Sequence, residues 1–201
     1  MILIGYSGHA FVVYGIIRSM GKTVTGYCDA TEKEYNPFKL PYLGNEQTET
    51  ARAALKINSF FIAIGDNVIR EKVFHSLSAQ NLFPQNAIHH SAVVDESAMI
   101  SQQCVMIAAN ATINPLVKIG TGVICNTSCS VDHECILEDF VHIGPGAVLC
   151  GNVKVGSKSF IGANAVIKQG VTIGCNAIIG AGAVVIKNVP DNTTVIGVPA
   201  K

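Results

Sequence analysis

The fold is decided by a stretch in the second half of the chain, residues 155–184, which reads VGSKSF IGANAV IKQGVT IGCNAI IGAGAV. Each block of six residues opens on Val or Ile. The same spacing runs unbroken from Ile107 to Val185, with an aliphatic residue or Cys at every sixth position. Helices repeat every 3.6 residues and strands every two, so neither element explains this period. Stacked hexapeptide coils of a parallel β-helix do explain it.

A second position in each block supports the same architecture. Four residues after each bulky position stands a small or β-branched residue, as Ala165 follows Ile161. A narrow prism has little room inside, so this alternation predicts an interior filled by both positions. An earlier series keeps the period one residue out of step: Ile88, Val94, Ile100 and Met106. We therefore expect one inserted residue near Met106.

Composition narrows the class of protein. Apolar residues make up 49% of the 201 residues and charged residues 14%, a balance that suits extensive burial, including burial against other subunits. The net charge of zero argues against a broad nucleic-acid-binding surface. No apolar run reaches the length of a membrane span, so no membrane insertion is expected. Met1 leads straight into an apolar segment without a signal-peptide pattern, and we expect a cytoplasmic protein.

Four of the seven cysteines follow the repeat and not a metal-ligand spacing. Cys104, Cys129 and Cys135 are expected in the small interior position, and Cys125 in the bulky one. Reduced cysteine packs as a small hydrophobic residue. We therefore expect packing cysteines and no metal.

Residues 1–85 have a different pattern, with apolar strands alternating with helices, which predicts a small Rossmann-like parallel α/β domain. The expected strands are residues 1–5, 22–28 and 60–64. The expected helices are residues 46–57, residues 68–80 and one with Val12, Val13, Ile16, Ile17 and Met20 on one face. Pro84 marks the join, after which residues 86–201 form the β-helix domain with a tail outside the repeat.

Three strand ends predict a nucleotide site, because ligands of open parallel sheets bind beyond the carboxyl ends of the strands. The candidate residues are Ser7, Gly8 and His9 after the first strand, Asp29 after the second, and Gly65, Asp66 and Asn67 after the third. The first loop reads G-x-x-G and not G-x-G-x-x-G, which favours a nucleoside diphosphate over a redox dinucleotide. The alternative is that these glycines only permit a strand-to-helix turn.

One histidine of the β-helix is the candidate catalytic base. His133 lies between two interior positions, so its side chain should point outward, and Glu134 beside it could orient the imidazole. Gly151 follows eighteen residues later and should stack one coil away, where its backbone N–H suits an oxyanion. His142 lies half a coil on. The alternative is that both histidines are simply surface residues.

Several motifs together resemble the left-handed β-helix (hexapeptide) acyltransferases, and within them the bacterial sugar acetyltransferases of the PglD and NeuD types. These motifs are Ser7-Gly8-His9, Ile62-Ala63-Ile64-Gly65-Asp66-Asn67, Asn126-Thr127-Ser128, His133-Glu134-Cys135, His142, Cys150-Gly151-Asn152-Val153-Lys154 and Gly197-Val198-Pro199-Ala200-Lys201. The likeness covers nearly the whole chain and is greatest to N-acetyltransferases of UDP-4-amino-4,6-dideoxy sugars, as in bacillosamine synthesis. Asp66 departs from the Asn expected at its position.

The resemblance implies a homotrimer with active sites between neighbouring β-helices, acetyl-CoA as co-substrate, and a nucleotide sugar held by the α/β domain. It implies that His133 is the catalytic base and Glu134 its partner. It places His142 and Gly151 near the acetyl thioester, Ala163 and Ala181 at main-chain contacts to CoA, and Asn126 near the acceptor amine. Ser7, Gly8, His9, Asp29 and the Gly65 loop match its nucleotide pocket.

The mechanism that follows is direct transfer in a ternary complex, without a nucleophilic Cys or a metal. Other acceptors stay open: a GDP-linked amino sugar, or the hydroxyl of a sialic acid in an O-acetyltransferase. A zinc hydratase on the same fold is disfavoured because its H-x-x-x-x-H spacing is missing. A non-catalytic assembly protein that binds nucleotide is the alternative from another class.

Overall fold

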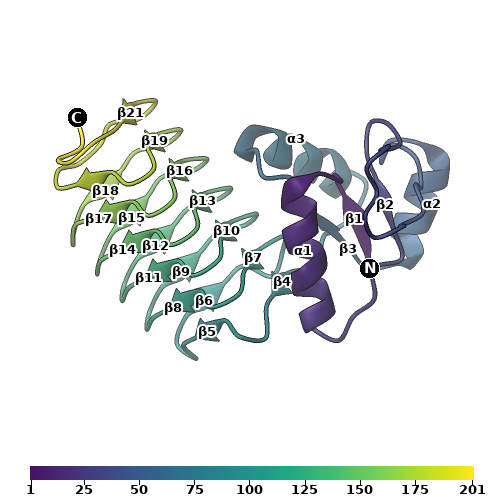
Figure 1. Ribbon diagram of the computed structural model, residues 1–201, viewed down its shortest axis with the longest axis horizontal. Coiled ribbons are helices and arrows are strands. Elements are labelled where there is room, and N and C mark those ends of the chain that lie inside the picture. The colour runs from purple at the N-terminus through teal and green to yellow at the C-terminus, as the bar shows by residue number, and fades with distance from the viewer.

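The computed structural model describes residues 1–201 and divides them into an α/β domain and a β-helix (Figure 1). The α/β domain holds a parallel sheet in the order β2-β1-β3. Its strands are β1 (Ile2–Ile4), β2 (Gly26–Cys28) and β3 (Phe60–Ile62). Its helices are α1 (Gly8–Ser19), α2 (Glu49–Ile57) and α3 (Asn67–Ser78). The three strands are parallel, so their carboxyl ends meet at one edge, as expected.

The expected elements of this domain are all present, with different bounds. The second strand covers only the last three of the seven residues expected to form it. α1 begins earlier than its apolar face suggested, and Val12 is 41% exposed whereas Val13, Ile16 and Ile17 are buried. Ala10 takes the remaining buried position on that helix.

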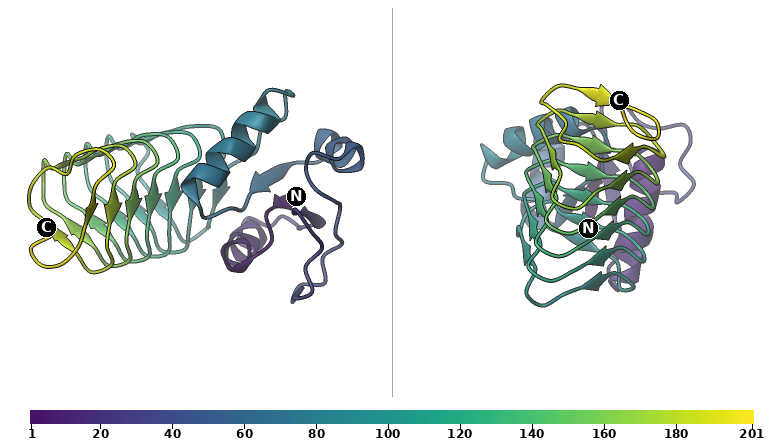
Figure 2. Two further views of the ribbon diagram at one scale, coloured as in Figure 1. Left: turned by 90° about the horizontal axis from the view of Figure 1, so that it is seen from above. Right: turned by 90° about the vertical axis from the view of Figure 1, so that its left-hand side faces the viewer.

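The β-helix is built from two-residue strands in three parallel sheets, and successive coils stack into a left-handed prism (Figure 2). The seven-strand face holds β4 (Ala87–Ile88), β7 (Met106–Ile107), β10 (Ile124–Cys125), β13 (His142–Ile143), β16 (Phe160–Ile161), β19 (Ile178–Ile179) and β21 (Thr194–Val195). The six-strand face holds β5 (Val93–Val94), β8 (Thr112–Ile113), β11 (Ser130–Val131), β14 (Val148–Leu149), β17 (Val166–Ile167) and β20 (Val184–Val185). The five-strand face holds β6 (Met99–Ile100), β9 (Lys118–Ile119), β12 (Ile136–Leu137), β15 (Lys154–Val155) and β18 (Thr172–Ile173).

Three corners join these faces, and each is named here by one residue. The Asn126 corner joins the seven- and six-strand faces, the His133 corner the six- and five-strand faces, and the Phe140 corner the five- and seven-strand faces. Each strand residue of these coils pairs with the residue eighteen positions later in the chain, as Ile124 pairs with His142. Each corner is therefore a column of residues eighteen apart. The second residue of each central strand is buried, which confirms the predicted interior.

The inserted residue lies in the first coil. Ile88 pairs with Ile107, one residue further than the repeat requires. Met106 is therefore wrongly assigned to the interior series, because it faces out of the prism and packs in the core of the α/β domain. Cys104 is corrected in the same way: it lies in that outer core, and Val105 takes the interior position. The extra residue falls between Ile100 and Ile107, which confirms the insertion expected near Met106.

The hydrophobic core of the α/β domain extends onto the outside of the β-helix, whereas the prism interior forms a second, separate core. The outward residues Met106, Ile124 and Phe140 belong to the buried cluster that also contains the sheet of the α/β domain.

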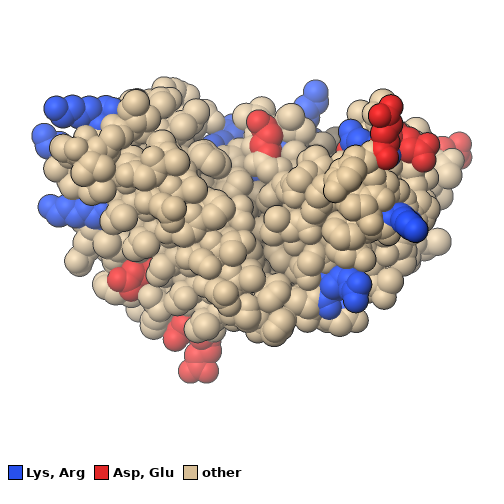
Figure 3. All heavy atoms as spheres, in the orientation of Figure 1, with Lys and Arg blue, Asp and Glu red and all other residues tan.

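The outer surface seen in Figure 3 carries Lys and Arg side chains near the C-terminal coils, with Asp and Glu side chains along the edge of the first coils. No helix has the length and apolar character needed to cross a membrane. All seven cysteines are free.

Candidate active site

His133 lies on the surface, in the turn between β11 and β12, with 47% of its side chain exposed. Its Nδ1 lies 3.1 Å from a carboxylate oxygen of Glu134. A carboxylate can only accept a hydrogen bond, so Nδ1 carries the proton and Nε2 presents a lone pair. The backbone N–H of His133 donates to Asp132 at 2.8 Å, and Asp132 also accepts from Asn114 on the preceding coil at 3.1 Å. The geometry suits a general base.

Gly151 stacks against His133 from the next coil, as the eighteen-residue spacing predicted. The backbone N–H of the following residue, Asn152, donates to the carbonyl oxygen of His133 at 2.8 Å. A Cβ added to Gly151 would overlap the imidazole ring, with its nearest contacts at Cε1 and Nε2. Only glycine therefore leaves the space beside the free ring nitrogen.

His142 occupies a different environment, at the junction of the two domains. It is 8% exposed, and its ring lies 6.0 Å from that of His9, centre to centre. Nδ1 lies 3.3 Å from the carbonyl oxygen of Gly65, and Nε2 lies 3.2 Å from the amide nitrogen of Asn126. Burial, with a smaller contribution from the Arg70 cation and then from His9, lowers the pKa of His142 to about 3. The imidazole is therefore neutral.

Within one chain the two candidate histidines do not share a site. His133 is at the corner between the six- and five-strand faces, whereas His142 lies on the seven-strand face. Asn126 lies with His142, and Ala163 and Ala181 lie at the same corner, in the column of Thr127. Gly151 stays with His133. The predicted residues thus form two half-sites on the two sides of the six-strand face.

The nucleotide candidates gather around a cavity of about 410 Å³ at the carboxyl edge of the β1–β3 sheet. Its lining includes Ser7, Asp29, Gly65 and Asp66. Ser7 caps α1 without using its hydroxyl, and the first turn of this helix carries no acid. Such a helix N-terminus suits a phosphate. Gly8, which begins α1, does not line this cavity, and neither do His9 and Asn67; His9 turns toward His142.

Asp29 is held in place by its neighbours. One carboxylate oxygen accepts from the backbone N–H of Tyr6 at 2.8 Å, and the other from Ala30 at 2.7 Å. The Lys33 ammonium lies 2.9 Å from the latter oxygen. Asp66 uses one oxygen to cap α3 by accepting from Ile69 at 2.8 Å. Both acids are therefore fixed in orientation at the cavity wall.

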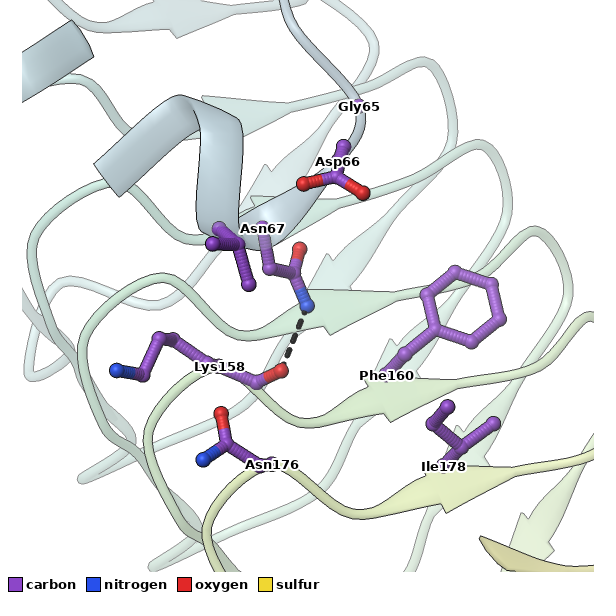
Figure 4. A pocket seen from close by; sticks show the side chains of 8 residues that line it. Gly65, Asp66, Asn67, Lys158, Phe160, Asn176 and Ile178 are labelled. Carbon is purple, nitrogen blue, oxygen red and sulfur yellow. Dashed lines mark hydrogen bonds between the residues drawn. The ribbon is translucent and has the colours of Figure 1, made fainter. Parts of the chain in front are cut away.

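A second cavity, of about 620 Å³, lies between the start of α3 and the β-helix (Figure 4). Gly65 and Asp66 line both cavities, so this loop is a shared wall. In the second cavity Asn67 donates to the carbonyl oxygen of Lys158 at 2.9 Å, and Phe160 and Ile178 project from the seven-strand face. No group of three or more His, Cys, Asp or Glu side chains could hold a metal ion.

The sequence analysis missed Arg70, which is fully buried at the domain junction. Its guanidinium donates to the carbonyl oxygen of Gly65 at 3.0 Å, the same oxygen that His142 approaches. Burial lowers the pKa of Arg70 to about 10, so it remains charged at neutral pH. A single Arg in an amphipathic helix has the pattern of a surface residue, and the sequence holds no signal that separates the two cases.

Comparison with protein families divides the chain in the same way. The PglD N-terminal domain family matches residues 1–77. The bacterial transferase hexapeptide family, which comprises six repeats, matches residues 134–169, and the hexapeptide repeat of succinyl-transferase matches residues 152–187. The matches cover both the α/β domain and the coils that hold Gly151.

Individual relatives agree with these families. A structure of the perosamine N-acetyltransferase from Caulobacter crescentus, in complex with CoA and GDP-perosamine, is 38% identical, with a TM-score of 0.93 over 100% of this chain and 94% of that one. The acetyltransferase domain of PglB from Neisseria gonorrhoeae FA1090, in complex with acetyl coenzyme A, is 33% identical, with a TM-score of 0.88 over 100% and 97%. The GDP-perosamine N-acetyltransferase of Escherichia coli O157:H7 is 38% identical over 102 residues. That alignment spans 51% of this chain and 46% of that relative, so the match covers about half of each.

Proposed function

This chain belongs to the hexapeptide-repeat sugar acetyltransferases of the PglD type, and we propose that it transfers the acetyl group of acetyl-CoA to the 4-amino group of a nucleotide-linked amino-dideoxy sugar. The observation that carries the proposal is the His133 corner. There the Nε2 lone pair of His133 faces the space that Gly151 leaves, while Glu134 holds the proton on Nδ1. Bacterial glycan synthesis is the process that consumes such a product.

In the proposed reaction the sugar amine attacks the carbonyl carbon of the thioester, and Nε2 of His133 takes the proton that the amine loses. The backbone N–H at Gly151 stabilises the developing oxyanion, whereas the neutral His142 has no free donor for that role because its one ring proton faces the carbonyl oxygen of Gly65. The C–S bond then breaks, and the CoA thiolate leaves. Alignment of the two substrates lowers the barrier by up to about 7–11 kcal/mol in favourable cases. No covalent enzyme intermediate and no metal are required.

The proposed active assembly is a homotrimer. The outward residues of the six-strand face are uncharged: Val93, Thr112, Ser130, Val148, Val166 and Val184. The five-strand face, by contrast, presents Lys118 and Lys154. A neighbouring subunit packed on the uncharged face would bring its Asn126 corner to the His133 corner. Ala163 and Ala181 would then line the same channel as Gly151, where CoA would lie.

A GDP-linked acceptor is the second candidate beside the UDP-linked sugar expected from sequence, because two of the relatives act on or bind GDP-perosamine. The cavity supports it with the acidic residue Glu46 in its lining. Burial raises the pKa of the Cys28 thiol to about 12, and the negative charge of Glu46 adds to this rise. Because Cys28 is the last residue of β2, the Glu46 carboxylate lies near the end of that strand. Guanine carries two adjacent donors, N1–H and N2–H, that suit a carboxylate.

The test is release of CoA thiol from acetyl-CoA with three acceptors, a UDP-4-amino sugar, a GDP-4-amino sugar and free sialic acid, and with buffer alone as the blank. Release with one nucleotide amino sugar supports the proposal and identifies the base. Release with sialic acid alone would replace it with O-acetylation. Nucleotide binding without any release would favour a non-catalytic assembly protein. A cytoplasmic location belongs to the same proposal, because acetyl-CoA is the donor.

A substitution of Glu46 tests which nucleotide base the cavity binds. Glu46→Gln replaces one acceptor oxygen with a donor, so it should raise KM for a GDP-linked acceptor about tenfold if the carboxylate binds guanine. KM for a UDP-linked acceptor should change less than twofold. Glu49→Gln is a matched control on the neighbouring turn, because Glu49 does not line the cavity. An equal effect on both acceptors would contradict the assignment of Glu46 to the base.

A further inference from the structure

Arg70 is a buried cation with no acidic partner. All five N–H groups of its guanidinium have acceptors, and every acceptor is a neutral oxygen. These oxygens are the carbonyls of Ile64 at 3.1 Å, Gly65 at 3.0 Å, Gly122 at 2.8 Å and Phe140 at 2.9 Å, and the side-chain oxygen of Asn67 at 2.8 Å. A buried charge costs several kcal/mol unless such bonds compensate it. A leucine or methionine would serve packing alone without that cost.

The acceptors of Arg70 belong to three segments that are far apart in sequence. Gly122 and Phe140 lie eighteen residues apart in the column of the Phe140 corner, and Lys158 is the next member. Asn67 donates to the carbonyl oxygen of Lys158, so Arg70 and Asn67 together contact three successive coils. The same guanidinium donates to the carbonyl oxygens of Ile64 and Gly65, in the loop that follows β3. The position of the Gly65 loop on the β-helix therefore depends on Arg70.

A chain of hydrogen bonds continues from this loop to the candidate site. The carbonyl oxygen of Gly65 can only accept, so Nδ1 of His142 carries the proton and Nε2 is an acceptor. Nε2 then accepts from the amide of Asn126 at 3.2 Å. The amide oxygen of Asn126 in turn accepts from the backbone N–H of Thr127 at 2.8 Å, which fixes its orientation. Each N–H donor in this series of hydrogen bonds thus has one acceptor.

From these contacts we infer that Arg70 is a positioning residue for acetyl transfer: by holding the Gly65 carbonyl it sets the tautomer of His142 and the orientation of the Asn126 amide. Gly65 also lines the nucleotide cavity. The loop thereby aligns the nucleotide with the Asn126 end of the reaction site. The inference rests on the proposed function for its effect on turnover, but not for its effect on the imidazole.

Two ionisable groups act on His142, and both disfavour its protonation. The Arg70 cation contributes after burial, and His9 contributes less. The same cation contributes, again after burial, to lowering the pKa of His9 to about 4. Burial thus keeps both imidazoles neutral, the Arg70 cation adds to this effect, and Arg70 also orders one of the two rings.

The first experiment is NMR of the wild-type protein labelled with ¹⁵N at histidine, with His142→Gln used to assign the signal. We expect a neutral His142 with its proton on Nδ1 from pH 5 to pH 8. A proton on Nε2, or a charged ring in that range, would overturn the inference. This readout needs no substrate, so it stays decisive if the acceptor panel fails.

The second experiment compares Arg70→Lys with Glu71→Gln. Lysine keeps the charge but has three donors for five acceptors, so kcat for the amino sugar should fall at least about tenfold, with KM for acetyl-CoA within twofold. The His142 signal should show mixed tautomers. Glu71 lies on the same helix as Arg70 and forms an ion pair with Lys158 of the β-helix. Glu71→Gln removes only that ion pair and should leave kcat and the His142 signal unchanged. A lower Tm for Arg70→Lys, with unchanged kcat and tautomer, would mean that Arg70 only ties the domains together. If Arg70→Lys does not fold, the wild-type tautomer decides.

Discussion

Two histidines nine residues apart in this chain have opposite surroundings. His133 is half exposed, and its Nδ1 faces the carboxylate of Glu134. His142 is buried at the domain junction, where its Nδ1 faces a carbonyl oxygen that also accepts from a cation. Burial lowers the pKa of His142, and the Arg70 cation adds to that effect. In the proposed reaction the first ring accepts a proton, whereas the second stays neutral and directs hydrogen bonds.

The difference comes from the half-coil spacing of the β-helix. Nine residues turn the chain from the His133 corner to the seven-strand face, and only that face is covered by the α/β domain. Residues of the same type, in the same repeat, thus take different roles according to which face they occupy. The predictions below test this contrast at each of the two regions.

The largest effect is expected for His133→Ala. Loss of the base should lower kcat by about 10²–10⁴, while Tm and CoA binding stay near wild type because the side chain is exposed. Thiol release under saturating substrates measures kcat, and calorimetry measures CoA binding. His90→Ala is the matched control, since His90 is an exposed histidine of the first coil. Near wild-type turnover of His133→Ala would end the assignment of His133 as base.

Gly151→Ala should have the next largest effect. The new methyl group overlaps the His133 ring, and a displacement of about 1 Å at a reacting group can cost about 10²-fold in rate. Turnover should fall by about that factor while the fold persists. Gly15→Ala is the control, because nothing lies within 4 Å of its added Cβ. Full activity of Gly151→Ala would show that the space beside His133 is not used.

The junction should make stability depend on pH. The folded-state pKa values of His142 and His9 are about 3 and about 4, below the ordinary 6.5. Unfolding therefore takes up protons once the pH falls below about 6.5, and the free energy of unfolding decreases from there toward pH 4. The slope approaches ~1.4 kcal/mol per pH unit for each histidine.

Urea denaturation from pH 7.5 to pH 4.5, at fixed protein concentration, measures this slope. His142→Gln removes one titrating group and should therefore reduce the slope. Equal slopes for wild type and His142→Gln would show that His142 is not held neutral by the fold.

The smallest effect is expected at the edge of the junction. Lys158 and Glu71 form a half-exposed ion pair at 3.2 Å, and such pairs contribute about 0.2–1 kcal/mol. Glu71→Gln should lower the free energy of unfolding by no more than that, and less in high salt. A loss of several kcal/mol in the same denaturation assay would place the ion pair among the main contacts between the domains.

The site was predictable where it depends on the repeat. The stacking of Gly151 on His133 follows from an eighteen-residue spacing, and the structure confirms it. The meeting of Ser7, Asp29 and Gly65 follows from the parallel order of the strands, and one cavity holds them. Arg70 was not predictable, because its five acceptors come from segments up to 70 residues away in sequence.

The sequence by itself determined the β-helix, its three-faced interior and the α/β domain before it. A periodic interior requires apolar residues at a fixed spacing, and that spacing can be read from the sequence. Only the tertiary structure decided which face the α/β domain covers, and therefore that His142 is buried and neutral. Those outcomes depend on packing between segments without a common repeat, and such contacts leave no local pattern in the chain.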